Sequence, residues 1–102
     1  MPQYDIYLPL TYNDGTAIES HKFELTRKEL LEKFGGFSVL RASDLVEGWW
    51  QFGERIIRDD IRIFRVVTDK DDEPFWKEYK ERLKTRFVQK DILIVNILAT
   101  KV

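Results

Sequence analysis

Residues Arg55–Val67 read RIIRDDIRIFRVV, a stretch rich in β-branched side chains and free of glycine and proline. This composition predicts a long β-strand, because β-branched residues fit a pleated sheet well. Successive side chains of a strand point to opposite faces, so the apolar residues divide into two sets. The first set is Ile57, Ile61, Ile63 and Val67, and the second contains Ile56, Phe64 and Val66. The strand is therefore expected to be apolar on both faces.

Immediately before this strand, Gly48–Phe52 reads GWWQF, and Phe52-Gly53-Glu54 supplies a turn. Together the two stretches predict a β-hairpin. On a regular strand Trp49 and Trp50 would point to opposite faces, so one indole would need a second covered surface. Alternatively, a β-bulge near Gly48 would turn both indoles to the same side.

After the strand, a helix is expected to begin at about Pro74, because proline's missing N–H costs nothing in a first helical turn. An acidic run, Asp69 to Glu73, precedes it, where carboxylates complement the helix dipole. Helix capping explains this run better than a calcium loop, whose glycine and terminal glutamate spacing are missing. The apolar stripe of the helix is Trp76, Tyr79, Leu83 and Phe87.

The N-terminal half predicts another strand and helix. Tyr4–Tyr12 alternates as a strand does, with Pro9 marking a bulge or the loss of a partner strand. The following helix ends at Phe34-Gly35-Gly36, because glycine is typical just beyond a helix. Its start has two interpretations: apolar spacing favours Ser20, whereas a capping box beginning at Thr26 favours a shorter helix.

A short strand, Phe37–Leu40, a loop or bulge, Arg41–Glu47, and a last apolar strand, Asp91–Val102, complete the chain. The order of elements predicts an α+β, ferredoxin-like βαββαβ two-layer sandwich, with an antiparallel sheet and two helices on one face. Residues 1–102 contain no internal repeat or linker and are expected to form a single domain.

Two helices can cover only one face of this sheet, although its strands are apolar on both. An exposed apolar face usually marks an interaction site, so we expect another subunit or a ligand to cover it. Alternatively, a long loop or the C-terminal tail of the same chain covers it. The candidate ligand or interface residues are Tyr7, Trp49, Trp50, Phe64, Arg62 and Ile94.

Composition narrows the possible chemistry. The chain has no cysteine, which excludes disulfides, thiolate metal sites and a cysteine nucleophile. The single histidine, His21, has no acidic or serine partner at a recognisable spacing, so no catalytic residue, metal site or cofactor is expected. A formal net charge of -1 argues against nucleic-acid binding. With no stretch that could span a bilayer and no signal peptide, a cytoplasmic location is expected.

The leading hypothesis is a non-enzymatic domain that self-associates through its sheet, with or without an enclosed small ligand. One alternative is a dimeric α/β-barrel enzyme that acts on a small molecule, with His21, Arg62 or Tyr7 lining a pocket. Another is a nucleic-acid-binding or nuclease-related module that uses the arginines of Arg55–Val67. The nuclease comparison requires an aspartate at the end of the first strand, whereas Asp5 lies near its start.

The stretch YLPLTYNDG, at Tyr7–Gly15, together with Phe34-Gly35-Gly36, Phe75-Trp76 and Asp91–Ile94, resembles a family of small uncharacterised bacterial proteins. The resemblance covers most of the chain and implies the longer form of the first helix. Because no activity is known for that family, the resemblance implies no site residues, cofactor or partner.

Overall fold

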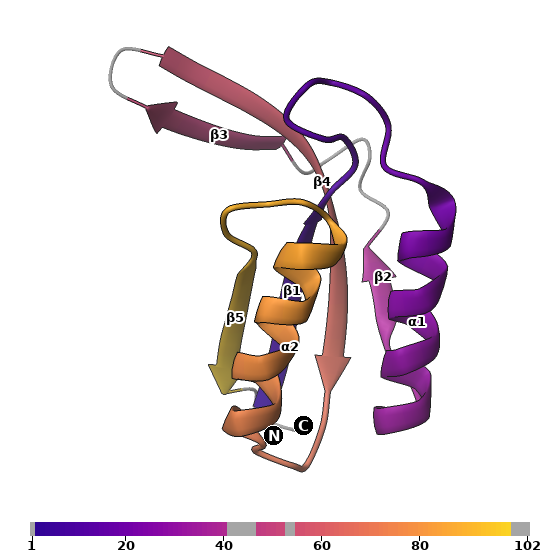
Figure 1. Cartoon of the computed structure of the whole chain (residues 1–102). Coiled ribbons are helices and arrows are strands. Elements are labelled where there is room, and N and C mark those ends of the chain that lie inside the picture. The colour runs from indigo at the N-terminus through magenta and orange to yellow at the C-terminus, as the bar shows by residue number, and fades with distance from the viewer. Residues whose placement is uncertain (1, 41–46, 53–54, 99–102) are drawn as a thin grey trace.

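The structure, a computed structural model, describes residues 2–40, 47–52 and 55–98, and the side chains of residues 2–39 and 61–98. Its elements in chain order are β1 (Pro2–Pro9), α1 (Ser20–Phe34), β2 (Ser38–Leu40), β3 (Glu47–Phe52), β4 (Arg55–Val67), α2 (Glu73–Arg86) and β5 (Leu93–Leu98). Both helices lie on one side of the sheet (Figure 1). The predicted ferredoxin-like α+β fold is therefore confirmed.

The sheet is antiparallel throughout, with strand order β2-β4-β1-β5, and β3 pairs with β4 outside this path. β1 is central, since Ile6 pairs with Phe64 of β4 and with Ile94 of β5. The two halves of β4 pair with different strands. Its second half pairs with β1 and β2, whereas its first half, residues 55–60, pairs with β3. Figure 1 shows this two-stranded ribbon projecting beyond the rest of the sheet.

β1 ends earlier than its sequence alternation predicts. Its pairing with β5 stops at Tyr7 and its pairing with β4 stops at Pro9, so the strand loses its partners at the proline. The chain then forms a turn in which Gly15, with a φ of 88°, donates to the carbonyl of Tyr12. Glycine adopts this left-handed conformation without a steric cost, which explains the Asn-Asp-Gly sequence.

α1 takes the longer of its two predicted forms. Thr26 lies inside the helix and is buried, and its hydroxyl donates to the carbonyl of Lys22 rather than capping a helix start. The helix ends as predicted at Gly35, which has a φ of 76° and donates to the carbonyl of Leu31.

α2 begins as the acidic run predicts. The side chain of Asp72 accepts a hydrogen bond from the backbone N–H of Phe75, and Pro74 occupies the first turn. No helix in the described ranges is long and apolar enough to cross a membrane.

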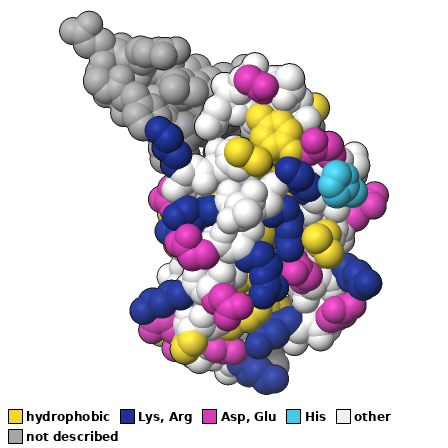
Figure 2. All heavy atoms as spheres, in the orientation of Figure 1, with side chains coloured by type: hydrophobic (Ala, Val, Ile, Leu, Met, Phe, Trp, Pro, Cys, Tyr) yellow, Lys and Arg dark blue, Asp and Glu magenta, His cyan; other side chains and the backbone are white. Residues whose placement is uncertain are grey.

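The hydrophobic core lies between the sheet and the two helices. β1 contributes Tyr4, Ile6 and Leu8, which pack with the predicted stripe of α2 and with apolar residues of α1. Aromatic rings close the end near the start of α2, where Tyr4 and Trp76 stack with centroids 4.3 Å apart. Figure 2 shows the helix side of the molecule, where acidic and basic side chains cover much of the surface.

Candidate functional site

The sheet face turned away from the helices is the candidate site, and we call it the open face. Alternation fixes its members, because Tyr4, Ile6 and Leu8 of β1 face the core and the residues between them face away. Residues paired across antiparallel strands share a face, which extends the set to β2, β4 and β5. The described open-face residues are Gln3, Asp5, Tyr7, Pro9, Ser38, Ile61, Ile63, Arg65, Val67, Leu93, Val95 and Ile97.

The open face is mainly apolar, as the sequence predicts. Its two charged residues in the described set are Asp5 and Arg65. Toward the edge formed by β5, Leu93 and Ile97 are each 43% exposed, and Val67 on β4 is 48% exposed. Ile61 and Ile63, by contrast, are buried. The exposed apolar surface is therefore concentrated around β5 and the end of β4.

An ion pair lies at the centre of this apolar face. Arg65 donates from Nε to one carboxylate oxygen of Asp5 at 2.9 Å and from Nη2 to the other at 3.0 Å. The side-chain amide of Gln3 donates to the same carboxylate at 3.3 Å. Asp5 is only 2% exposed, although no helix covers this face. Hydrogen bonding to Asp5 raises the pKa of the Arg65 guanidinium, and the nearby Tyr7 adds to the effect.

The residues proposed from the sequence do not form one site. Tyr7 lies on the open face and is half-buried. Phe64 lies on the opposite, helix-facing side and is fully buried in the core. Arg62 lies over the ring of Phe23 from α1, 5.4 Å from its centroid, and Ile94 packs against the core. Of the described side chains in the proposed set, Tyr7 alone therefore belongs to the open face.

The two tryptophans lie on β3, where Trp49 is paired with Arg58 and Trp50 with Ile57. Their side chains lie outside the described part of the chain, so the direction of each indole stays a prediction. β3 itself belongs to the projecting ribbon, which has no helix drawn against it in Figure 1. A two-stranded ribbon is only marginally stable alone in water, which makes the ribbon a second candidate contact region.

The alternative functions receive less support from the geometry. The exposed His21 is at the start of α1, and Arg62 and Tyr7 are on opposite faces of the sheet, so these three residues do not line one pocket. Arg62 and Arg65 also point to opposite faces, which divides the arginines of β4. Within the described ranges, no three His, Cys, Asp or Glu residues are placed to hold a metal ion.

A shallow cavity lies beside α2 and β5. It has a volume of about 300 Å³ and is lined by Tyr4, Asp71, Glu73, Trp76, Lys77, Lys80, Ile94 and Asn96. Tyr4 donates its hydroxyl hydrogen to Asp71 at 2.8 Å. Burial, followed by this hydrogen bond, raises the pKa of Tyr4 to about 12. Tyr4 and Asp71 satisfy each other, whereas the buried Nε1 of Trp76 has no hydrogen-bond partner among the described residues. The cavity extends the aromatic core and does not suggest a reaction.

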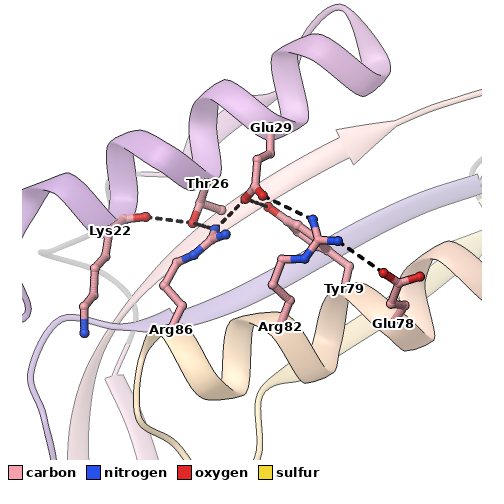
Figure 3. A network of polar contacts seen from close by, with 7 residues as sticks. All are labelled: Lys22, Thr26, Glu29, Glu78, Tyr79, Arg82 and Arg86. Atoms are coloured by element: carbon pink, nitrogen blue, oxygen red, sulfur yellow. Dashed lines mark hydrogen bonds and ion pairs between the residues drawn. The ribbon is translucent and has the colours of Figure 1, made fainter.

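Sequence reasoning missed a polar network between the helices, shown in Figure 3. Glu29 of α1 accepts hydrogen bonds from Tyr79, Arg82 and Arg86 of α2. Arg86 also donates to the hydroxyl of Thr26 at 2.9 Å. No sequence signal pairs residues from two separate helices, because only their packing brings them together. The network fastens α1 to α2 and leaves the open face as the stronger candidate site.

No family profile and no characterised protein sequence matches this chain. Solved structures do share its fold. The divalent cation tolerance protein CutA1 from Thermus thermophilus matches with a TM-score of 0.64 and 14% sequence identity, over 99% of this chain and 86% of that protein. CutA1 from Pyrococcus horikoshii matches with a TM-score of 0.57 and 17% identity, over 100% of this chain and 86% of that one.

A phage SAM lyase, solved in complex with S-methyl-5'-thioadenosine, matches with a TM-score of 0.59 and 10% identity. The match covers 96% of this chain and 89% of the lyase chain. Identities this low show a shared fold and carry no site residue across. The chain therefore has the ferredoxin-like fold of the CutA1 structures over almost its whole length.

Proposed function

We propose that the protein is a non-enzymatic domain that forms a homo-oligomer through its open face. The observation that supports this proposal is the exposed apolar surface of Leu93 and Ile97 on β5, with the exposed Val67 of β4 across Gln3 of β1 from Ile97. An apolar patch of this kind on a folded domain usually marks a contact surface. Burial of these side chains contributes roughly 25 cal/mol per Å² of apolar area, which favours association when the two surfaces fit.

The projecting ribbon gives independent support. Residues 55–60 of β4 pair with β3 and with no other described strand. Because such a ribbon is marginal alone, contact with a neighbouring copy would stabilise it. A dimer is the simplest assembly that would cover both the open face and the projecting ribbon. The same packing could enclose a small ligand. The absence of cysteine agrees with a cytoplasmic site of action.

Light scattering coupled to size-exclusion chromatography tests this proposal at micromolar protein concentration. We expect the mass of a dimer or a larger oligomer for the unaltered chain. Ile97→Lys places a charge on the open face and should shift the mass toward that of one chain. Leu31→Lys is the matched control, because Leu31 is 51% exposed on α1, away from the open face. A monomer for the unaltered chain would refute self-association.

A further inference from the structure

Arg65 keeps hydrogen-bonding capacity that the described chain does not use. A guanidinium has five N–H donors in a fixed planar arrangement. Asp5 accepts two of them, from Nε and from Nη2. Among the described side chains, those of residues 2–39 and 61–98, these are the only side-chain hydrogen bonds of Arg65. The edge formed by Nη1 and the second hydrogen of Nη2 therefore remains available, and this edge fits the two oxygens of a carboxylate.

The orientation of this edge is fixed in advance. Asp5 holds Arg65 through two bonds, and Gln3 holds Asp5 in turn. A side chain whose position is already fixed loses less entropy when it binds a ligand. Arg65 is partly open, with 35% of its side chain exposed, whereas the side chain of Asp5 is 3% exposed. The guanidinium therefore faces outward and its counter-ion lies beneath it.

Apolar side chains lie on the β5 side of Arg65, whereas the polar Ser38 of β2 pairs with it on the other side. Val95 lies across β1 from Arg65, since both residues pair with Asp5. Leu93 and Ile97 follow on the same face of β5, and Tyr7 is close enough to influence Arg65 electrostatically. A ligand bound at Arg65 would thus place its remaining atoms against hydrocarbon and an aromatic ring. An acid with an apolar body matches both parts of this surface.

We propose that Arg65 binds the carboxylate of a small organic acid whose apolar body lies against the open face. The proposal deepens the proposed function, because association through the open face would enclose this acid. A covered guanidinium with unsatisfied donors is costly, so the covered state needs an acceptor there. A second copy packed by the same face does not supply a carboxylate from the described residues, since Asp5 is the only one there and is already bound.

The charge balance favours a monoanion. Asp5 and Arg65 cancel, so the described open face is neutral before a ligand binds. A carboxylate adds one negative charge, whereas a phosphate dianion would add two in a largely apolar surrounding. Benzoate, with one carboxylate on a flat apolar ring, is the probe that the surface fits best.

Titration of the isotopically labelled full chain with benzoate, followed by NMR, tests the proposal. We expect saturable shifts at the backbone amides of Asp5, Tyr7, Arg65 and Val95. Benzamide has the same shape without the charge, and should bind at least about tenfold more weakly, because bonds between charged groups are the strong ones. Arg65→Gln should weaken benzoate binding by a similar factor. Arg65→Lys should bind benzoate more tightly than Arg65→Gln but more weakly than the unaltered chain, since an ammonium lacks the planar pair of donors.

Lys28→Gln is the matched control, because it removes a cation that is 73% exposed on α1. It should leave benzoate binding unchanged. Arg65→Gln also weakens the fold by leaving Asp5 without its counter-ion, so the comparison of benzoate with benzamide on the unaltered chain is the decisive one. Equal binding of the two compounds, tighter binding of inorganic phosphate, or no saturable shift would each overturn the proposal.

Light scattering on the same samples separates this proposal from self-association. A monomer that binds benzoate at Arg65 would retain the ligand site and refute the oligomer. An oligomer that dissociates with Ile97→Lys but does not bind benzoate would retain self-association and refute the ligand site.

Discussion

Arg86 of α2 donates a hydrogen bond to Glu29 of α1 and fastens the two helices to each other. The side chain of Arg86 is 10% exposed and that of Glu29 is 23% exposed, so the pair is largely shielded from water. Tyr79 and Arg82 donate to the same carboxylate. Removing one partner of such a shielded ion pair lowers stability, because the remaining charge stays shielded from water without its counter-ion.

Glu29→Gln should therefore lower the free energy of unfolding by about 2 kcal/mol. Urea denaturation followed by tryptophan fluorescence measures the change. Glu78→Gln is the control, since Glu78 is 75% exposed and pairs with Arg82 at the surface. Glu78→Gln should lower the free energy of unfolding by less than about 0.5 kcal/mol. Equal losses for the two variants would show that the helix network contributes no more than a surface pair.

The same carboxylate should make stability depend on acid pH. Burial acts to raise the pKa of Glu29, but hydrogen bonds from Arg86, Tyr79 and Arg82 outweigh it and hold the pKa below 4.5. The unfolded chain then binds a proton more readily than the folded one. The stabilisation by Glu29 is full above about pH 4.5 and is lost as the pH falls through the lower folded pKa. The difference in unfolding free energy between the unaltered chain and Glu29→Gln should shrink over this range, and a constant difference would contradict the assignment.

Tyr4 should affect stability at alkaline pH. Burial, followed by the hydrogen bond to Asp71, raises its pKa to about 12 from the ordinary 10.0. The folded chain retains this proton after the unfolded chain has lost it, so stability is full below pH 10 and falls as the pH rises toward 12. Tyr4→Phe should reduce this slope by up to about 1.4 kcal/mol per pH unit. Urea denaturation at several alkaline pH values provides the slopes, and unchanged slopes would refute the role of Tyr4.

Alanine substitutions at the two glycines after α1 should have different effects on stability. Gly35 has a φ of 76°, a conformation that costs alanine about 1 kcal/mol. Gly36 does not have a positive φ of this kind, and nothing lies within 4 Å of the position a Cβ would take. Gly35→Ala should lower the melting temperature, whereas Gly36→Ala should be neutral or slightly stabilising. The opposite order would mean that the helix does not end at Gly35.

Phe64 and Tyr7 were proposed together from the sequence as interface residues, but their substitution should have different effects. Phe64 is fully buried beneath the helices, so Phe64→Ala should cost about 3–5 kcal/mol of stability. Tyr7 is half-buried on the open face, so Tyr7→Ala should cost less stability and should weaken association. Denaturation and light scattering on both variants measure the two effects. A monomeric, fully stable Phe64→Ala variant would contradict the placement of Phe64.

The fold was predictable because its signals are local. Pro74 with the acidic residues before it marks the start of α2, and Gly35 marks the end of α1. Alternation in β1 assigned Tyr4, Ile6 and Leu8 to a common face, and the structure places all three in the core. The end of β1 was harder to predict, because the alternation continues to Tyr12 after its pairing with β4 and β5 has stopped.

The candidate site was less predictable because it depends on register. The sequence shows that β4 is apolar on both faces, but only pairing with β1 shows that Phe64 faces the helices and Ile63 faces away. The ion pair of Asp5 and Arg65 has the same origin. These residues are far apart in the chain, and nothing local indicates that they lie opposite each other. Sequence reasoning therefore found the apolar open face and missed its charged centre.

The central position of β1 also has a consequence for biosynthesis. Its residues leave the ribosome before those of β4 and β5, so Ile6 receives its partners only when Phe64 and then Ile94 have been made. Pairings between distant residues form slowly because the loop between them must close first. The nascent chain must therefore carry the apolar β1 without its partner strands until β4 and β5 have been made, and chaperones that shield such segments would act on it before then.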